Sequence, residues 1–479
     1  MDLTRYRDII PEWERFLGAA ARPEPTVFRV RTGRISEAEL CDRLHRQGFQ
    51  LRPLPGLSTF FQVESGPFPV TLTFEHWHGL IYVQQASTGA AAPALGARPG
   101  ERVLDLCSAP GGKTTHLAEI MEDRGCLVAC EIDERRIRGL LGNVYRLGHT
   151  NILVVAGDGR HFPDGALYDR VLVDAPCSGE GTLRRRAGAP PNQSESFLRY
   201  VTATQRALLE RAVRLTRPGG TILYVTCTFA PAENEAVVSA VLSDPSVDLE
   251  PLDLPIPHAP GLTSFGEARF DPRLSGAARI YPHHLDSGGL FLAKLKRTGE
   301  PAGSDEWSSV PAAFPEGGAA EEEADDLIGH GLDVLHERYG VDTALHPEWD
   351  WTVRGGRAWL HTVCEWPIGS WEDGSWRPVS VGQRALEFDT KGRPRPTNDF
   401  LRMLAADVTR GVADLSRSEL DALLVRDPVS TDIELRGPIA LRYNGDVIGR
   451  GAVTGAGLVS EIPKARAADL KRVLGMGAG

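Results

Sequence analysis

The 479-residue chain contains no run of about twenty apolar residues, the length that a helix needs to cross a membrane. Its N-terminus, MDLTRYRDIIPEW, carries too many charges for a signal peptide. We therefore expect a soluble, cytoplasmic protein that does not contact a membrane. The chain is also too long for one ordinary domain, so two to four domains are expected.

The seven cysteines lack the paired spacing of a zinc site. Cys126 and Cys130 have three residues between them, and no matching pair occurs elsewhere. We predict no metal site and no disulfide framework. Reduced thiols are typical of a cytosolic enzyme.

A surplus of positive charge is also missing, because the formal net charge is −11. Spread uniformly, this charge would argue mildly against binding to nucleic acid. However, nine acidic residues and no Lys or Arg lie between Glu300 and Asp326, so the rest of the chain is nearly neutral and can carry basic patches. Pro301 to Ala324 is rich in Pro, Gly, Ala and Glu and has no periodicity. We therefore assign residues 298–326 to an acidic flexible linker.

Residues 1–90 predict a small α+β domain that contacts RNA. The pattern gives a helix from Ser36 to Gly48 with Ser36 as its N-cap, strand-like alternation from Phe60 to Phe74, and a short strand from Leu80 to Gln84. Three basic residues precede the helix: Arg29, Arg31 and Arg34. They either contact RNA or belong to a solvated strand edge.

Residues 91–297 alternate short apolar runs with helical segments. The expected strands are 103–107, 126–130, 152–155, 171–173 and 222–225, and the clearest helices are 134–147 and 201–215. Continuously apolar strands are buried on both faces, and their alternation with helices indicates a doubly wound, Rossmann-like α/β sheet. Such a sheet binds nucleotide cofactors at the carboxyl ends of its strands.

Beyond the linker, residues 327–400 and 401–479 have globular composition. Six of the nine tryptophans lie between Trp349 and Trp376. They could stack on unpaired bases, but in a β-rich segment they more often form a core. Strand-like runs near the C-terminus flank Asn444-Gly445, a typical hairpin turn, and suggest a small β-barrel.

The segment VLDLCSAPGGKTT, from Val103 to Thr115, predicts a strand, a glycine-containing loop and a helix. Its spacing is not that of a phosphate-binding P-loop. Gly111 and Gly112 would let the backbone approach a ligand closely, and Asp105 ends the strand.

Three further acidic residues follow successive strands. Glu131 lies about twenty residues after the loop, where ribose hydroxyls are bound in nucleoside-binding sheets. Asp158 and Asp174 follow the next two strands, and Asp158 suits an adenine edge. Acidic strand ends leave no phosphate pocket, which favours S-adenosylmethionine over NAD or ATP. Asp133 is expected to be a helix N-cap instead.

Two thiols are directed at the same edge of the sheet. Cys177 follows Asp174 in the segment VLVDAPCSGEGTL, and Cys227 follows the next strand in TILYVTCTF. A helix beginning at PAENE, residues 231–235, could lower the pKa of a nearby thiol. Two thiols beside a methyl donor suit methylation of a pyrimidine at carbon 5. A thiolate that adds to carbon 6 makes carbon 5 nucleophilic, and a base must later remove the carbon 5 proton.

These motifs resemble the RNA 5-methylcytosine methyltransferases of the Sun type. The similarity rests on VLDLCSAPGGKT, LVDAPCSGEGTLRR and YVTCTFAPAENE, with GLIYVQQAST before them and RIYPHHLDSGGLFLAKL after them. Within that family the chain is most similar to the bacterial RsmF/YebU type, which methylates 16S rRNA. The resemblance covers roughly residues 25–297. It extends more weakly to LRYNGDVIGRGAVTGAGLVSEIPKA, which is similar to a PUA-like RNA-binding domain at residues 401–479.

The resemblance implies a role for each matching residue. Cys227 would be the nucleophile and Cys177 would promote product release, while Lys113 and Asp174 would orient or polarise the cytosine. S-adenosylmethionine would be bound by Cys107, Ser108, Ala109, Pro110, Gly111, Gly112, Lys113, Glu131, Asp158 and Asp174. The segment AGAPPNQSES, residues 187–196, departs from the family pattern near the expected RNA channel.

Arg184, Arg185 and Arg186 follow the Cys177 loop and are either phosphate contacts or an exposed basic turn. The sequence thus predicts a monomeric rRNA cytosine-C5 methyltransferase. The alternatives are a tRNA cytosine-C5 methyltransferase, a DNA methyltransferase that uses the Pro-Cys cysteine, and a non-catalytic RNA-binding factor for ribosome assembly. Deletion of residues 327–479 is expected to weaken RNA binding and to leave cofactor binding intact.

Overall fold

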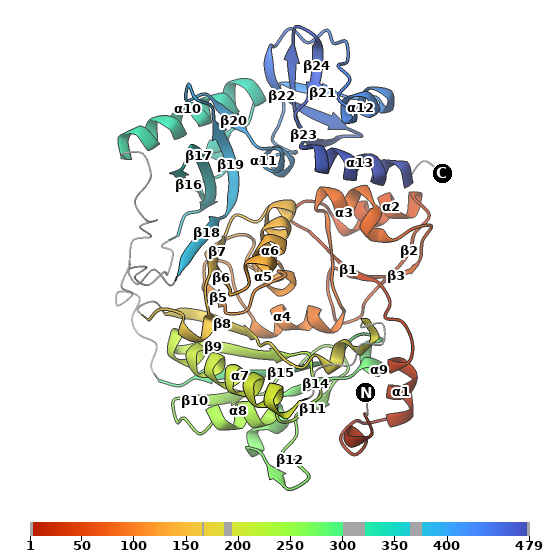
Figure 1. The fold of residues 1–479 in the computed structure, drawn as a ribbon, viewed down its shortest axis with the longest axis vertical. Helices are drawn as coiled ribbons and strands as arrows, with labels where there is room; N and C mark the ends of the chain where they lie inside the picture. Colours follow the sequence, from red (N-terminus) through yellow and green to blue (C-terminus); the bar gives the residue numbers. More distant parts are fainter. Residues whose placement is uncertain (1–2, 165–166, 186–193, 300–320, 365–375, 477–479) are drawn as a thin grey trace.

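The computed structural model describes residues 3–164, 167–185, 194–299, 321–364 and 376–476. Figure 1 shows a central sheet, with the first 95 residues along one side of it and the end of the chain at the top. Of the helices within the described ranges, none is both long and apolar enough to span a membrane.

The central sheet has ten strands. Five of them are parallel and form its middle: β9 (Thr216–Thr226), β8 (Tyr168–Asp174), β5 (Arg102–Asp105), β6 (Cys126–Glu131) and β7 (Ile152–Ala156). Antiparallel strands β15 (Leu290–Arg297), β14 (Ala278–Ile280), β11 (Ala259–Pro260) and β10 (Val247–Glu250) extend the side next to β9. All five strands expected from the apolar runs are present, so the predicted Rossmann-like sheet is confirmed.

Two hydrophobic cores lie on opposite faces of this sheet. Helices α4 (Ala91–Leu95), α5 (Gly112–Ile120) and α6 (Glu134–Leu147) contribute to one core, with Leu117 and Ile137 fully or almost fully buried. Helices α7 (Glu195–Leu215) and α8 (Glu235–Val241) contribute to the other. Asp133 is the predicted N-cap of α6 and accepts hydrogen bonds from the backbone of Arg135 and Arg136.

The first residues divide into a hook and a small sheet. The hook, residues 4–20, comprises η1 (Thr4–Tyr6) and α1 (Trp13–Ala20), and it packs on Phe229 and Tyr281 of the central domain. The sheet has the order β2-β3-β1-β4, with β2 (Gln50–Pro53), β3 (Phe60–Ser65), β1 (Val27–Val30) and β4 (Ile81–Val83). Helices α2 (Glu37–Arg46) and α3 (Phe74–His78) accompany it.

In this region the sequence predicted one element correctly and one only in part. The Ser36 side chain accepts a hydrogen bond from the Glu39 backbone, so the predicted capped helix is confirmed. The strand expected from Phe60 to Phe74 is wrong beyond Ser65, because Pro67 and Pro69 cannot donate hydrogen bonds to a neighbouring strand. A 3-10 turn, η2 (Val70–Leu72), and α3 follow instead.

The prediction that Arg29, Arg31 and Arg34 contact RNA or solvent at a strand edge is wrong. Arg29 is 1% exposed and pairs with Glu119, and Arg31 is 5% exposed and pairs with Asp123. Arg34 donates to the backbone carbonyls of His78, Arg146 and Arg402. These side chains therefore join the N-terminal sheet to the rest of the protein.

After the central domain, the chain forms a second sheet. Its order is β16 (Trp349–Arg354), β17 (Arg357–Thr362), β19 (Gln383–Phe388) and β20 (Pro394–Pro396), and helices α10 (Glu321–Tyr339) and α11 (Asn398–Met403) pack with it. The predicted linker ends too late, because residues 321–326 already belong to α10. Its residues 300–320 lie outside the described residues.

One strand of this region, β18 (Arg377–Val381), leaves the second sheet and pairs with β7 of the central sheet. The predicted boundary between the central domain and residues 327–400 is therefore crossed by a continuous sheet. Trp376 is 5% exposed, and Trp349, Trp351 and Trp359 pack against buried cores. These contacts support the core interpretation of the tryptophans. Trp366 and Trp371 lie outside the described residues.

The end of the chain forms a four-stranded sheet of β21 (Val412–Asp414), β22 (Gly437–Tyr443), β23 (Asp446–Thr454) and β24 (Gly457–Ser460). Helices α12 (Arg417–Leu424) and α13 (Lys464–Met476) pack on it. Asn444 and Gly445 both have positive φ angles, 51° and 87°, and connect β22 to β23, so the predicted hairpin turn is confirmed.

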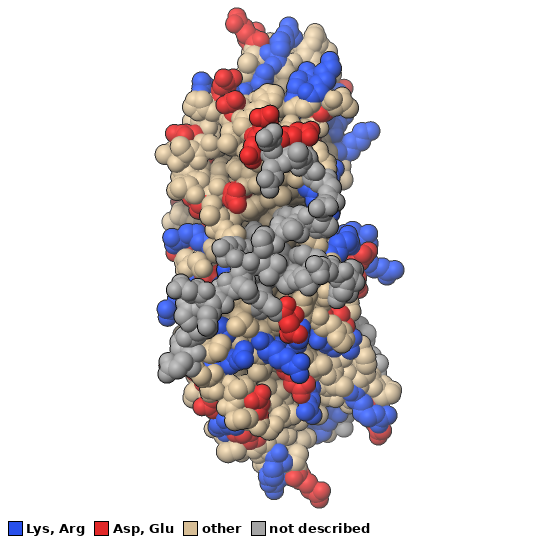
Figure 2. Space-filling view, turned by 90° about the vertical axis from the view of Figure 1, so that its left-hand side faces the viewer, with Lys and Arg blue, Asp and Glu red and all other residues tan. Residues whose placement is uncertain are grey.

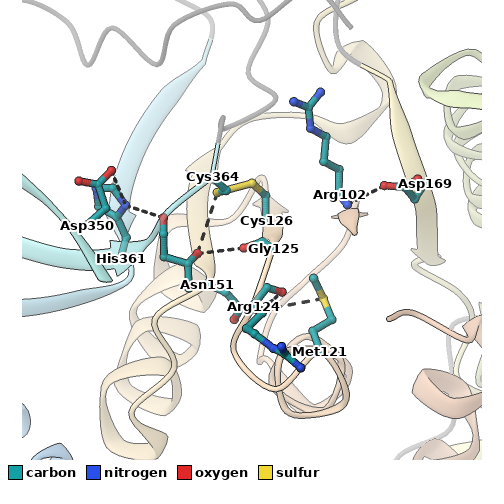
Figure 3. Close-up of a disulfide and its surroundings, with 11 residues drawn as sticks. Arg102, Met121, Arg124, Gly125, Cys126, Asn151, Asp169, Asp350, His361 and Cys364 are labelled. Atoms are coloured by element: carbon teal, nitrogen blue, oxygen red, sulfur yellow. Dashed lines mark hydrogen bonds and ion pairs between the residues drawn. A yellow bond between two sulfur atoms is a disulfide. The ribbon is translucent and has the colours of Figure 1, made fainter. Parts of the chain in front are cut away.

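A disulfide joins the second sheet to the central one. Cys364, two residues after β17, bonds to Cys126 at the start of β6, with Cα atoms 6.3 Å apart (Figure 3). The expectation of reduced thiols is therefore wrong for this pair. The sequence spacing gave no signal, because 238 residues separate the two cysteines and only the fold brings them together. Cys41, Cys107, Cys130, Cys177 and Cys227 carry thiols.

Candidate active site

The side chains predicted to act on cofactor and substrate lie at the carboxyl ends of the five parallel strands. Asp105, Glu131 and Asp174 are the last residues of β5, β6 and β8. Asp158 follows β7 by two residues, and Cys227 directly follows β9. Because these strands are parallel neighbours, the fold gathers the residues at one edge of the sheet.

Lys113 and Asp174 form an ion pair at this edge, with 2.7 Å between Nζ and Oδ2. Lys113 comes from the first turn of α5, and its side chain is 12% exposed. Burial by itself would lower the pKa of Lys113, but the charge and hydrogen bond of Asp174 together raise it. The lysine is therefore a fixed cation next to Asp174.

The two thiols predicted to be catalytic are in contact. The Sγ atoms of Cys177 and Cys227 are 3.2 Å apart, and both residues are partly exposed. The hydrogen bond to Cys227, followed by burial, raises the pKa of Cys177 well above its ordinary value. Either sulfur can donate the proton in this contact. The Lys113 ammonium lies within electrostatic range of Cys227, and a nearby cation favours a thiolate.

Two residues that the sequence did not single out for a role hold the chain on either side of Cys227. Asn234 accepts a hydrogen bond from Thr226 Oγ1 at 2.5 Å and donates one to the carbonyl of Thr228 at 3.0 Å. Glu233, which is fully buried, accepts a further hydrogen bond from Thr228 at 3.4 Å. Helix α8 begins only at Glu235, so Glu233 and Asn234 lie before the helix and hold the Cys227 loop through their side chains.

Glu233 also holds the loop of Cys177. Its carboxylate accepts hydrogen bonds from the backbone NH of Ser178 at 2.8 Å and from the Ser178 hydroxyl at 2.5 Å. Gln205 of α7 donates to the same carboxylate at 3.0 Å and to the carbonyl of Pro176 at 2.8 Å. One buried carboxylate therefore fixes both cysteine loops. The sequence signal available for this role was the pair of acidic residues in the segment PAENE.

A second buried carboxylate connects the hook to the same loops. Glu180 is 1% exposed and accepts hydrogen bonds from the hydroxyl of Tyr6 at 2.9 and 3.1 Å. Arg5 forms an ion pair with it, and Thr228 donates to it at 3.1 Å. The hook thus contacts the loop that follows Cys227.

The glycine-containing loop is fastened to β5 and β6. Asp105 accepts hydrogen bonds from the backbone of Cys107 at 3.2 Å and from Thr114 at 2.7 Å, and burial raises the pKa of Asp105 to about 7. Ser108 donates to the carbonyl of Cys130 at 2.9 Å. Gly111, directly before α5, has a φ angle of 103°, a conformation that residues with a side chain rarely adopt.

The residues around this loop fit an adenosyl group with a cationic centre. Glu131 is bonded to the backbone of Ala109 at 3.2 Å, so the acid and the loop form one wall. Ile132, next to it, is 62% exposed and offers an apolar surface to a base. The acids at the strand ends would repel phosphate. Arg136 and Arg160 now pair with Glu131 and Asp158, and their side chains are 51% and 29% exposed.

The arginine run after the Cys177 loop has a mainly structural role. The Arg184 side chain is 1% exposed and bonds to Asp286 and to the carbonyls of Arg22, Pro23 and Ser287, so its prediction as a phosphate contact is wrong. Arg185 is 51% exposed and pairs with Glu24. Arg186 and residues 187–193 lie outside the described residues. On the face drawn in Figure 2, the basic and acidic side chains of the described residues are interspersed.

Comparisons with known proteins match both the central domain and the full chain. A family model described as 16S rRNA methyltransferase RsmB/F matches residues 92–296. The Ribosomal RNA small subunit methyltransferase F of Vibrio cholerae is 30% identical over 462 residues, which cover 94% of this chain and 92% of that protein.

Two further similarities cover part of this chain. The human 28S rRNA (cytosine(4447)-C(5))-methyltransferase is 35% identical over 304 residues, which cover 62% of this chain and 37% of the human protein. The crystal structure of a methyltransferase homolog protein from Pyrococcus horikoshii has 34% sequence identity and a TM-score of 0.56, and it covers 61% of this chain and 93% of that chain.

Proposed function

The chain belongs to the RsmB/F family of 16S rRNA methyltransferases, and from this premise we propose that it forms 5-methylcytosine in small-subunit ribosomal RNA. Membership of the family makes it an RNA (cytosine-C5)-methyltransferase that uses S-adenosylmethionine. The choice of small-subunit rRNA follows the relative that matches this chain along almost its full length.

The observation that carries the proposal is the contact between the thiols of Cys177 and Cys227 beside the Lys113–Asp174 ion pair. A covalent methylation at carbon 5 needs one thiolate to add to the ring and one group to complete its release. Cys227 occupies the Thr-Cys position, and the nearby Lys113 ammonium favours its thiolate. We assign Cys227 as the nucleophile on this basis.

In the proposed reaction, the Cys227 thiolate forms a bond to carbon 6 of the cytosine, and the electrons of the 5,6 double bond move to carbon 5. S-adenosylmethionine supplies the methyl group that carbon 5 takes up. Lys113 and Asp174 orient the base, with Asp174 able to accept from its amino group. A base then removes the carbon 5 proton, the double bond re-forms, and the bond from Cys227 to carbon 6 breaks.

The geometry explains how Cys177 could become that base. Its pKa is raised first by the hydrogen bond to Cys227, and the charge of Cys227 contributes as well. Once Cys227 is bonded to carbon, both of these causes are removed, and burial and the charge of Glu233 remain as the causes that favour the thiol. Cys177 can then lose its proton to solvent and accept the one from carbon 5. The addition of Cys227 to carbon 6 thereby prepares Cys177 to act as the base in the release step.

S-adenosylmethionine would be held by residues 107–113 together with Glu131, Asp158 and Asp174. Glu131 and Asp158 would exchange their arginine partners for hydroxyl and amino groups of the adenosyl moiety, and Ile132 would pack against its base. The C-terminal sheet of β21 to β24 would act as a PUA-like RNA-binding domain. The enzyme would act as a monomer in the cytoplasm, where the ribosomal subunits are.

The alternatives differ in the nucleic acid they require. A tRNA methyltransferase or a DNA methyltransferase could use the same strand ends, and a ribosome-assembly factor would need no reaction at all. The Thr-Cys position of Cys227 argues against the DNA enzyme. The thiol contact and the Lys113–Asp174 pair argue against a non-catalytic factor, because binding RNA requires neither.

Bisulfite sequencing of RNA methylated in vitro tests the substrate. The protein would be incubated with S-adenosylmethionine and with 16S rRNA or tRNA, both from a strain that lacks its gene. We expect protein-dependent protection of cytosines in 16S rRNA alone. Protection in tRNA alone would favour the tRNA enzyme, and no protection in either RNA, naked or in the small subunit, would refute the proposed activity.

A further inference from the structure

The C-terminal region completes the central sheet next to the predicted cofactor site. Strand β18 pairs antiparallel with β7, with Val381 opposite Leu153 and Arg377 opposite Ala156 (Figure 1). This pairing runs along β7 up to its last residue. Asp158, which would bind the adenosyl group, follows two residues later. The strand that delivers Asp158 is therefore paired on both edges.

Trp376, directly before β18, covers the peptide that leads to Asp158. A Cβ atom built on Gly157 would lie 2.3 Å from Cζ3 of Trp376, so the indole lies against the bare backbone of Gly157. Phe162 packs edge-to-face against the same indole, with ring centroids 5.0 Å apart and an interplanar angle of 62°. Since Trp376 is only 5% exposed, the indole is part of the central core.

The same peptide connects the two acids of the predicted cofactor site. The backbone NH of Gly157 donates to the carbonyl of Glu131 at 3.0 Å, and Cys130 Sγ contacts the Gly157 carbonyl at 3.3 Å. A shift of Gly157 would therefore move Asp158 and loosen its connection to Glu131.

Other contacts hold the C-terminal region on the same elements. Ser380 of β18 is hydrogen-bonded to Tyr145 of α6 at 2.8 Å, and Gln383 donates to the carbonyls of Val144 and His149. The Cys126–Cys364 disulfide fixes the region to the start of β6 (Figure 3). These three attachments are made to α6, to the residues that follow it and to β6, and β6 and α6 lead to and from Glu131 of the predicted adenosyl site.

We propose that Trp376 is a positioning residue for the cofactor, because it holds the Gly157 peptide so that Asp158 and Glu131 face the adenosyl group together. This inference rests on the proposed function, in which those two acids bind S-adenosylmethionine. It reverses the expectation that residues 327–479 serve RNA binding alone. Deletion of that region would remove both Trp376 and β18 from the site.

Calorimetric titration with S-adenosylhomocysteine, without RNA, tests the proposal in the full chain. Trp376→Ala should weaken binding about tenfold, because small displacements of binding groups are costly. Trp376→Phe should restore most of the affinity. Trp351→Ala should leave affinity unchanged, because Trp351 is packed edge-to-face on Phe400 in the second sheet. In the assay of methyl transfer, Trp376→Ala should raise the KM for S-adenosylmethionine and change kcat little.

Gly157→Ala supplies an independent test that keeps the tryptophan. Its added methyl would collide with the indole, so it should weaken binding in the wild-type background and cost no further affinity in the Trp376→Ala background. Unchanged affinity of a folded Trp376→Ala protein would overturn the proposal. If Trp376→Ala does not fold, unchanged affinity of a folded Gly157→Ala protein would overturn it. Failure of the wild-type protein to bind S-adenosylhomocysteine would instead contradict the proposed function.

Discussion

At the scale of single residues, the two thiols depend on side chains that carry out no chemistry. Glu233 accepts two hydrogen bonds from Ser178 and one from Gln205, and it shares the hydroxyl proton of Thr228 with Glu180. Without the carboxylate, the donors from Ser178 and Gln205 would lose this acceptor, at a cost of about 1–3 kcal/mol for each unsatisfied group. The distance between Cys177 and Cys227 would then no longer be fixed.

We therefore expect Glu233→Ala to lower kcat about a hundredfold and to leave the affinity for S-adenosylhomocysteine unchanged. Glu233→Gln should recover much of the activity, since an amide can still accept from Ser178 N and can donate to the hydroxyl groups. Steady-state kinetics and calorimetry on both variants give the comparison. If a folded Glu233→Gln protein loses as much kcat as Glu233→Ala, the result would argue against a positioning role.

Asp105 gives a pH-dependent prediction. Burial raises its pKa to about 7 in the folded protein, whereas the ordinary value is about 4. Between these two pH values the folded state binds more protons at this position than the unfolded state. The contribution of Asp105 to the free energy of unfolding is therefore most favourable below pH ~4 and is lost as the pH rises to ~7. Asp105→Asn mimics the protonated form and removes this dependence.

Melting temperatures of the ligand-free protein test this prediction. The advantage of Asp105→Asn over the wild type should grow between pH 5 and pH 8, and the difference in unfolding free energy should reach at most about 4 kcal/mol. A constant difference over this range would show that Asp105 is not protonated in the fold. The mutation should not disturb the local bonds, since an amide can still serve Cys107 and Thr114.

At the scale of elements, the sequence predicted what local chemistry determines. The capped helix after Ser36, helix α6 and the Asn444-Gly445 turn depend on neighbouring residues. The parallel strands followed from apolar runs that must be buried on both faces. Because acids and cysteines follow these strands, the candidate site could be predicted as well.

The sequence did not predict pairings between distant segments. Strand β18 joins β7 across more than two hundred residues, and a short apolar run gives no information about its partner. Arg29 looked like a solvated residue because Glu119, its partner, lies 90 positions away. Glu233 and Glu180 were missed as organisers of the site for the same reason.

The Cys126–Cys364 disulfide is such a distant pairing and can be tested chemically. It closes a loop of 238 residues, and the chain-entropy argument gives a stabilisation of about 5 kcal/mol for a loop of that size. Peptide mapping of protein purified without reductant should recover Cys126 linked to Cys364. Adding reductant should lower the melting temperature. Alkylation of both cysteines in the native, unreduced protein would contradict the assignment.

At the scale of the whole molecule, the C-terminal sheet and the catalytic edge would act on one RNA. Exposed basic residues on α13 are available to bind phosphates: Lys464, Lys471 and Arg472. Changing all three to Glu should weaken RNA binding at every sequence. It should also reduce the salt dependence, by about 0.7–0.9 in log–log slope for each phosphate that the variant no longer neutralises.

Filter binding over a series of salt concentrations measures both effects. Arg269→Glu is a suitable control, because Arg269 is exposed in β13 (Ala268–Arg269), which pairs with β12 (Ser264–Phe265). Strand β12 lies at the bottom of Figure 1, whereas α13 lies in its upper half. The control should bind RNA as the wild type does. An unchanged slope for the triple variant would place the RNA elsewhere on the protein.

The division of labour between the two thiols is the central claim, and trapping of the RNA adduct tests it most directly. Wild type, Cys177→Ala and Cys227→Ala would each be incubated with substrate RNA and S-adenosylmethionine and separated on a denaturing gel. Cys177→Ala should accumulate a covalent protein–RNA complex through Cys227, because addition proceeds and release does not. Cys227→Ala should form no complex and transfer no methyl group. A complex formed by Cys227→Ala and absent from Cys177→Ala would reverse the two roles and contradict the account.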